Sequence, residues 1–333
     1  MKKSFAAWIG IWAIASSAPA LAEPIVLKFN SPAPPPSFLH GGAFNPWAKA
    51  VSEASGGTLK VEMYYGGTLG GFPITYDRVL DGVADIGFIL TAFAKGKFRQ
   101  EDVAALPFES KSSVAAANAL WQIYEQGLTA KEFDAVKPLG IWTFPNSALN
   151  AKSPVRSLDD LKGHKVTVSN PIAGRTVVAL GAAPVAMAPT EVYQAISRGL
   201  ADMALMPFTG VATFKIGDVA THHVDAALGA DSAVVFINRR KFDSLPAQAK
   251  AAIDRYSYLS FSQTLGRVTD AEWARSRGTL KDVTTLSAAE EARWKKLVAP
   301  VAEQWARETP DGEKILAAFR AENAAFEASH KGK

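Results

Sequence analysis

The sequence has 333 residues, of which 48% are hydrophobic and 20% charged, and its formal net charge is +4. It holds no cysteine, which excludes disulfides, thiol nucleophiles and cysteine metal sites. The absence of cysteine also excludes the lipid that bacterial lipoproteins carry on that residue. The 36 Lys and Arg residues are scattered among 32 acidic ones. The chain therefore lacks the basic stripe that is typical of nucleic-acid binding.

The first 22 residues have the plan of a secretory signal peptide. Two lysines precede a short apolar stretch at residues 5–15, and Ala20–Ala22 offers a cleavage site before Glu23. The apolar stretch is too short to span a bilayer comfortably, and no later segment has the uninterrupted apolar length of a membrane helix. We expect an exported protein of the Gram-negative periplasm without a lipid anchor. The rest of the chain is long enough for two domains.

A strand–helix–strand unit occurs twice in the chain. In the first copy the strand-like LKVEMYY (59–65) leads through a Gly-rich turn and a helix to the apolar run VADIGFIL (83–90). In the second copy HKVTVS (164–169) leads to a helix, a short strand, a second helix and LADMALMPF (200–208). Strand, helix and strand at this spacing indicate a βαβ unit and a parallel sheet. The repeat predicts two similar α/β lobes.

Other segments fit the same architecture. We expect helices at 43–54 and 113–126 and a strand at 234–238, and Ser287 with Glu290 forms a capping box that opens a long amphipathic helical region. A hydrophobic stripe at helical spacing in that region is expected to pack onto the lobes: Trp294, Leu297, Val301 and Trp305.

The predicted fold class is therefore α/β, with two lobes, a hinge and a ligand cleft between the lobes. Residues 23–145 and 234–272 are assigned to the first lobe. Residues 146–233 and 273–333, which include the C-terminal helices, are assigned to the second. Strand ends and helix N-termini converge on such a cleft, and their N–H groups and positive dipole ends suit anions.

Five segments with distinctive composition follow one another along the chain: FNPWAKAVSEASGGTLKVEMYYGGTLGG (44–71), VLDGVADIGF (79–88), SLDDLKGHKVTV (157–168), ALGAAPVAMAPTEVYQAISRGLADM (179–203) and INRRKFDSLPAQAKAAI (237–253). In this order they resemble the solute receptors of TRAP transporters, the C4-dicarboxylate-receptor (DctP) type. The resemblance covers nearly all of the chain beyond the signal peptide. It implies a two-lobe fold braced by unusually long helices. It also implies delivery of solute to an integral-membrane permease that is driven by an ion gradient.

The sequence departs from that family at three positions that matter for the ligand. Family members usually carry an arginine two residues after the lysine of LKG-x-K, where it clamps the ligand carboxylate, but Thr167 stands here. Leu90 and Met206 likewise stand where the family often has polar groups. A threonine hydroxyl cannot supply bidentate recognition of a carboxylate. We therefore expect a small organic acid, a monocarboxylate with an apolar or aromatic body, rather than a dicarboxylate.

Arg175, eight residues after Thr167, is the nearest candidate for a replacement anion contact, and its alternative is a solvated helix arginine. Polar residues near predicted strand ends are candidates for the cleft or, equally, ordinary turn and capping residues. Aromatic residues at comparable places wall a pocket or belong to the core. The polar set is Asn30, Thr91, Asn146 and Asn170, and the aromatic set is Trp142, Phe144 and Phe208.

Catalytic signatures are missing from the sequence. It has no Gly-x-Ser-x-Gly elbow, phosphate-binding P-loop or His-Glu-x-x-His motif. His222 and His223 are adjacent, so on a strand they point to opposite faces and do not chelate one metal. We expect no catalytic residue, cofactor or metal, and a transport receptor whose partners are a small organic acid and a membrane permease. The alternative is a sensory binding protein that presents its ligand to a membrane signalling partner.

The cleavage site generates the first testable prediction. Export should remove residues 1–22, because the Ala-x-Ala pattern follows a basic start and an apolar stretch. N-terminal sequencing of protein from the periplasmic fraction should begin at Glu23. Recovery of the full-length chain in the membrane fraction would contradict export.

Overall fold

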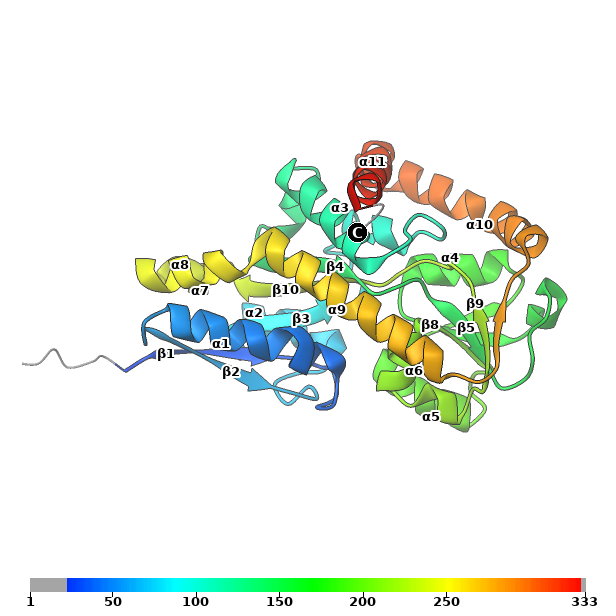
Figure 1. Ribbon diagram of the computed structural model, residues 1–333, viewed down its shortest axis with the longest axis horizontal. Helices are drawn as coiled ribbons and strands as arrows, with labels where there is room; N and C mark the ends of the chain where they lie inside the picture. The colour runs from blue at the N-terminus through cyan, green and yellow to red at the C-terminus, as the bar shows by residue number, and fades with distance from the viewer. Residues whose placement is uncertain (1–22, 331–333) are drawn as a thin grey trace, which may run out of the picture.

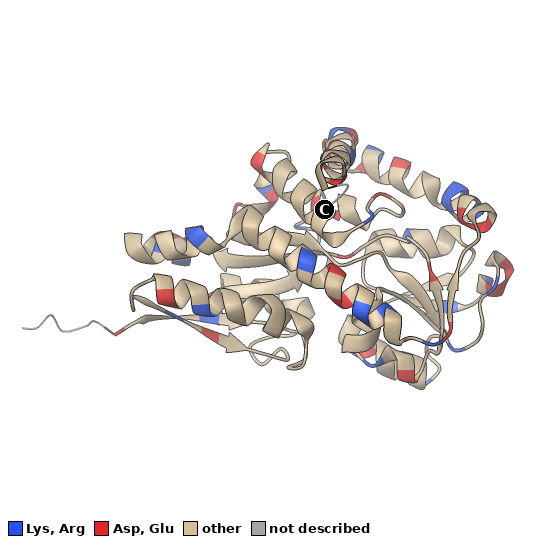
Figure 2. Cartoon of the chain, in the orientation of Figure 1, with Lys and Arg blue, Asp and Glu red and all other residues tan. Residues whose placement is uncertain are grey.

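The computed structural model describes residues 23–330, so the predicted signal peptide lies outside the described residues. Two lobes lie side by side along the long axis of the molecule, and each is built on a sheet with helices against it (Figure 1). Basic and acidic side chains are interspersed over both lobes (Figure 2). Within residues 23–330, none of the helices combines the length and the apolar character that crossing a bilayer requires.

The first lobe contains a five-stranded sheet in the order β2-β1-β3-β10-β4. Strand β1 pairs in parallel with β2 and β3, whereas β10 pairs antiparallel with β3 and β4. The strands are β1 (Ile25–Asn30), β2 (Leu59–Tyr64), β3 (Ile86–Leu90), β4 (Val136–Thr143) and β10 (Ser232–Asn238). The helices of this lobe are α1 (Asn45–Ala54), α2 (Thr75–Leu80), α3 (Ser113–Glu125), α7 (Arg239–Ser244) and α8 (Ala247–Tyr256).

The second lobe contains a six-stranded sheet in the order β11-β9-β5-β8-β6-β7. Strand β6 pairs in parallel with β7 and β8, whereas β5 pairs antiparallel with β8 and β9. The strands are β5 (Ala148–Ala151), β6 (Lys165–Val168), β7 (Ala183–Ala186), β8 (Met203–Met206), β9 (His222–Asp225) and β11 (Val283–Thr285). The helices are α4 (Pro171–Ala179), α5 (Val192–Ser197) and α6 (Phe208–Thr213).

The two α/β lobes predicted from the repeat are confirmed, but their sheets are mixed rather than parallel. The antiparallel members, β5 and β10, are the strands that follow a crossing from the other lobe. Strands β3 and β8 end at the space between the lobes, where Leu90 and Met206 face a shared cavity. A strand that arrives from the opposite lobe begins at this same edge, so it runs in the reverse direction.

Before the C-terminal helices, three segments connect the lobes. Residues 144–147 lead from β4 to β5, residues 226–231 lead from β9 back to β10, and the long helix α9 (Tyr258–Thr279) runs diagonally across both lobes (Figure 1). The first two segments lie side by side. The Phe144 amide donates to the Asp231 carbonyl at 2.9 Å, and the Ser147 amide donates to the Gly229 carbonyl at 2.6 Å.

The C-terminal helices α10 (Ala288–Glu308) and α11 (Gly312–His330) cover one side of the molecule (Figure 1). The Ser287 hydroxyl accepts from the Glu290 amide at 3.2 Å, which confirms the serine half of the predicted capping box. The Glu290 carboxylate accepts instead from the Trp294 indole at 3.0 Å, so the reciprocal bond is not made. The predicted stripe is buried except for Leu297, which is 42% exposed because Val298 faces the core instead. Helix α10 packs on α4, whereas α11 packs on α3 of the first lobe, a contact that the assignment of residues 273–333 to the second lobe did not include.

Helix α9 approaches α3 so closely that a glycine is required at the contact. A Cβ at Gly266 would lie 2.5 Å from the Cα of Val114 and 2.9 Å from the carbonyl oxygen of Ser113, both of them backbone atoms. Backbone cannot move aside as a side chain can, so a methyl group here would force the two helices apart. In the last turn of the same helix, a Cβ at Gly278 would meet no atom within 4 Å.

These two glycines form a matched pair for a stability measurement. We expect Gly266→Ala to lower the free energy of unfolding by about 1–3 kcal/mol, as overpacked cores do. Gly278→Ala should leave it unchanged or raise it by about 0.5–1 kcal/mol, since alanine is the better helix former. Urea denaturation of both variants beside the wild type makes the comparison. Equal effects of the two substitutions would contradict the close contact.

Candidate functional site: an apolar cavity between the lobes

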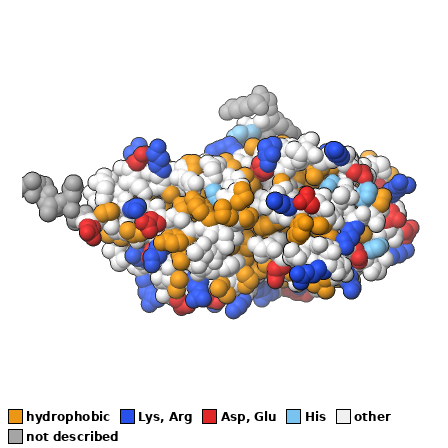
Figure 3. All heavy atoms as spheres, turned by 90° about the horizontal axis from the view of Figure 1, so that it is seen from below, with side chains coloured by type: hydrophobic (Ala, Val, Ile, Leu, Met, Phe, Trp, Pro, Cys, Tyr) orange, Lys and Arg blue, Asp and Glu red, His pale blue; other side chains and the backbone are white. Residues whose placement is uncertain are grey.

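A cavity lies between the two lobes and encloses about 630 Å³ of space that no atom fills, part of it open to solvent. The first lobe contributes Ala33, residues 37–39, Phe72 and part of β3 to its lining. The second lobe contributes the ends of β6 and β8 and the start of α6. Seen from below, hydrophobic side chains run across the middle of the molecule, and charged ones lie mostly towards its edges (Figure 3).

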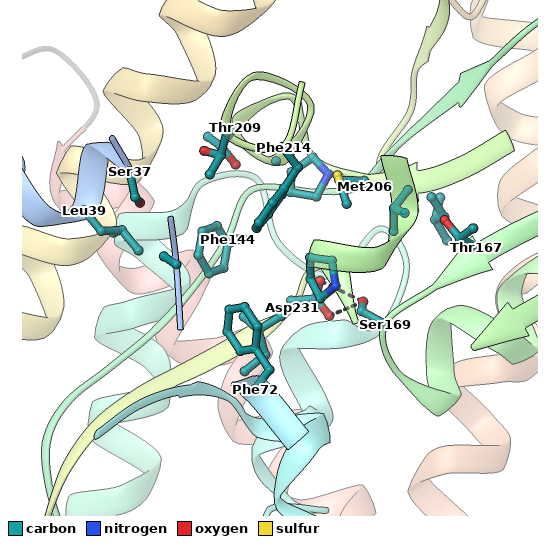
Figure 4. A pocket seen from close by; sticks show the side chains of 18 of the residues that line it. Ser37, Leu39, Phe72, Phe144, Thr167, Ser169, Met206, Thr209, Phe214 and Asp231 are labelled. Carbon is teal, nitrogen blue, oxygen red and sulfur yellow. Dashed lines mark hydrogen bonds between the residues drawn. The ribbon is translucent and has the colours of Figure 1, made fainter. Parts of the chain in front are cut away.

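Aromatic rings form much of the cavity wall. Phe72 comes from the first lobe, Phe214 from the second and Phe144 from the connection between them, and Met206 lies beside Phe214 (Figure 4). The rings also contact other aromatic residues of the lining. Phe144 meets Phe38 edge to face with centroids 6.5 Å apart, and Phe72 has the same relation to Phe88 at 5.8 Å. Such pairs stabilise ring positions beyond simple burial, so the wall is preformed.

Polar groups are few in this wall. Among the described residues that line the cavity, Asp231 is the only one with a charged side chain, and there is no Lys, Arg or His. Hydroxyl groups supply most of the remaining polarity, and that of Thr209 is buried without a hydrogen-bond partner in the described structure. An unpartnered buried hydroxyl is costly, and Thr209 is 0% exposed, so its hydroxyl lies beneath the cavity surface.

Asp231 is 8% exposed and is held by two donors from the start of α4. The Ser169 hydroxyl lies 2.6 Å from Oδ1 and 2.8 Å from Oδ2, and Nδ2 of Asn170 donates to Oδ1 at 2.8 Å (Figure 4 draws the Ser169 contacts). Asn170 also caps α4, since its Oδ1 accepts from the Ala173 amide at 2.7 Å. Burial raises the pKa of Asp231, although the bonds from Ser169 and Asn170 act to lower it.

Further buried carboxyl groups lie behind Asp231, in the first lobe. Burial, with the nearby Glu132, raises the pKa of Asp102 to about 8, and the charge of Asp231 contributes to this rise. Burial also raises the pKa of Glu132 to about 7 against hydrogen bonds from the Gln100 and Glu101 amides at 2.7 and 3.2 Å. Glu101 is fully buried, and burial raises its pKa well above the usual range. Protons therefore reside on this cluster near neutral pH.

Several residues proposed from the sequence come together at the cavity. Leu90, Thr167 and Met206, the three positions that depart from the family pattern, all line it, as does Phe144. Asn170 lies immediately behind the wall, where it holds Asp231.

Other proposed residues have structural partners instead. Asn30 holds the Gly-rich turn through bonds from Nδ2 to the Gly70 carbonyl at 2.8 Å and to the Thr75 hydroxyl at 3.0 Å. Nδ2 of Asn146 donates to the Ser110 carbonyl at 2.7 Å. Trp142 and Phe208 are fully buried in the hydrophobic cores of their lobes.

Arg175 and Thr91 line a neighbouring pocket rather than the apolar cavity. The Arg175 guanidinium donates to Glu308 of α10 at 2.7 Å and keeps a side-chain exposure of 36%. This placement does not support the expected anion contact, because the guanidinium already has a carboxylate partner. The Thr91 hydroxyl lies 3.2 Å from the Ser232 carbonyl oxygen and 3.3 Å from Oδ1 of Asp102.

The sequence analysis missed Asp231, Ser169, Thr209, Phe72 and Phe214. Asp231 immediately precedes the apolar strand β10, and Asn146 was proposed from the same kind of signal, a polar residue at the edge of a strand.

The two adjacent histidines have separate partners, since Nδ1 of His223 bonds to Asn150 at 2.8 Å and His222 pairs with Asp282. Across residues 23–330, no group of three or more His, Cys, Asp or Glu side chains is arranged to hold a metal ion.

The fold agrees with comparisons to known proteins. Residues 29–309 match the model of the bacterial extracellular solute-binding protein family 7. The chain belongs to this family. Family 7 proteins are solute-binding proteins rather than enzymes. The C4-dicarboxylate-binding periplasmic protein DctP of Rhodobacter capsulatus is 27% identical over 319 residues, which are 93% of this chain and 95% of that protein.

Two solved structures of TRAP solute-binding proteins superpose closely on this family 7 chain. One from Rhodoferax ferrireducens, in complex with copurified benzoate, has a TM-score of 0.87, 28% identity and coverage of 92% of this chain and 99% of that one. The other, from a marine metagenome, is specific for aromatic acid ligands and contains 3-hydroxybenzoate. Its TM-score is 0.87 and its identity 25%, and it covers 91% and 99% of the two chains.

The buried acids generate a prediction about stability and pH. Asp102 retains its proton in the folded state up to about pH 8, whereas an unfolded aspartic acid releases it near pH 4. Its contribution to stability is therefore complete below pH 4 and is lost progressively as the pH rises towards 8, by about 1.4 kcal/mol per pH unit.

Urea denaturation at pH 5, 6.5 and 8 measures this effect. The free energy of unfolding of Asp102→Asn should decline less with rising pH than that of the wild type, because an amide does not titrate. The exposed Asp81→Asn, which lies in the same lobe, serves as the control and should follow the wild type. Parallel pH profiles for all three proteins would show that Asp102 does not hold a proton in the folded state.

Proposed function

We propose that this protein is the periplasmic receptor of a TRAP transporter, and that it captures an aromatic or similarly apolar monocarboxylate and delivers it to the integral-membrane permease. The observation that carries the proposal is the cavity between the lobes, which has an aromatic wall and no basic side chain among the described residues. Membership of the solute-binding family supports the receptor role. The permease partner and the periplasmic location follow from the TRAP relatives.

The composition of the wall favours one carboxylate over two. Leu90 and Met206 present carbon, and Thr167 presents a single hydroxyl where the family usually offers a guanidinium. Each carboxylate taken out of water without matched donors costs several kcal/mol. An aromatic body offsets that cost, because each Å² of carbon surface buried contributes about 25 cal/mol. Benzoate and 3-hydroxybenzoate, the ligands of the two similar structures, have this character.

The proposal predicts a ligand preference and a residue that produces it. Isothermal titration calorimetry should give tighter binding of benzoate or 3-hydroxybenzoate than of succinate. Phe144→Ala should weaken aromatic-acid binding about tenfold or more, because the lost ring contact is worth about 1–2 kcal/mol. Phe326→Ala, in α11 and outside the cavity lining, is the matched control and should bind as the wild type does.

Two results would contradict this proposal. Succinate binding as tight as that of benzoate would exclude selection for an apolar body. An unchanged affinity in Phe144→Ala would show that the aromatic acid does not bind against this wall of the cavity. Arg175→Ala decides the remaining question of the anion contact. We expect it to bind as the wild type does, since Glu308 already pairs with the guanidinium, and a loss of ten- to a hundredfold would restore Arg175 as the clamp.

A further inference from the structure

The charge of the cavity does not match that of an organic acid. Its one ionisable lining residue in the described structure, Asp231, is itself a carboxylic acid, and Ser169 and Asn170 already donate to it. If Asp231 and the ligand both remained ionised, two like charges would share an apolar space that lacks a cation. Carboxylates placed together in this way retain one proton between them.

We propose that capture of the organic acid is coupled to the uptake of one proton from solvent, which is held between the carboxyl group of Asp231 and the carboxylate of the ligand. This inference rests on the proposed function, since it requires that the ligand is an acid. The proton comes from water and no covalent bond between heavy atoms changes. The complex then carries one negative charge in the cavity instead of two.

The hydrogen bonds of Asp231 indicate which oxygen carries the proton. Oδ1 accepts from both Ser169 and Asn170, at 2.6 and 2.8 Å, whereas Oδ2 shares only the Ser169 hydroxyl at 2.8 Å. A hydroxyl has one proton to donate, and it serves the nearer Oδ1. Oδ2 is therefore free to bear the proton and donate it to the ligand carboxylate, a charge-assisted bond of the strong kind.

The groups around Asp231 do not supply a substitute cation. On the first-lobe side its neighbour is Asp102, and behind that lie Glu132 and Glu101, all carboxyl groups. Arg99 acts on Asp102 rather than on the cavity. On the second-lobe side, Arg175 of α4 is neutralised by Glu308 of α10.

Burial already favours the protonated form before ligand arrives, since it raises the pKa of Asp231. A bound anion raises this pKa further. Between the pKa of the free protein and that of the complex, affinity should fall up to tenfold for each unit of rising pH. The ligand itself is ionised throughout, because carboxylic acids ordinarily titrate near pH 4.

Calorimetry with benzoate and 3-hydroxybenzoate on the purified protein tests the coupling. Titrations at pH 6, 7 and 8, in pairs of buffers that differ in ionisation enthalpy, report the number of protons taken up. For the wild type we expect uptake approaching one proton and an affinity that weakens as the pH rises. Asp231→Asn should bind without proton uptake and independently of pH, because its amide donates to the ligand while remaining neutral. Asp102→Asn, which alters an adjacent acid outside the cavity lining, should retain the uptake.

The outcomes separate this inference from the proposed function. Aromatic-acid binding that is independent of pH and releases or absorbs no proton in the wild type would overturn the coupling and leave the receptor function intact. Uptake that persists in Asp231→Asn but disappears in Asp102→Asn would also overturn it, since the proton would then reside on Asp102. Absence of binding to either acid between pH 6 and 8 would overturn the proposed function and the coupling together. The wild-type measurement decides the central point even if a variant fails to fold.

Discussion

The hydrogen-bonded pair of connecting segments between the lobes, residues 144–147 and 226–231, determines what the cavity contains. Because the Phe144 amide is bonded to the Asp231 carbonyl, an aromatic ring and a carboxyl group occur together at the boundary of the two sheets. The segment 226–231 contacts the backbone of the first lobe at Gly229. A Cβ there would lie 2.1 Å from the Ala105 carbonyl oxygen, so this contact requires glycine. The polar and apolar determinants of the site thus belong to the connection itself, and each lobe adds carbon surface from its own strand ends.

The three departures from the family pattern make physical sense as a set. Thr167, Leu90 and Met206 come from β6, β3 and β8, which end at the same space. Together they give this end of the cavity carbon surface and one hydroxyl, without a basic group. The proposed preference for an apolar acid rests on these side chains rather than on the fold, since function depends on the site.

Sequence patterns predicted the lobes well because local signals repeat in them. The end of each βαβ unit, at VADIGFIL and LADMALMPF, is the buried strand expected, β3 or β8. The cavity was predicted less completely. The position of Asp231 depends on the connecting segment 226–231, whose neighbours in the fold are distant in sequence. Arg175 pairs with Glu308, which is 133 residues away. Such pairings are tertiary, so periodicity and capping rules cannot specify them.

Helix α9 has a mechanical consequence for the whole molecule. It crosses both lobes (Figure 1), and it contacts α3 in the first lobe and α6 in the second. Helices α10 and α11 add a further link, because α10 packs on α4 and α11 packs on α3. Links that run at different angles restrict twisting and sliding of one lobe against the other, since these movements would change the distances that the links span. The lobes therefore form a braced pair rather than two bodies on one flexible linker, and the cavity lies between them.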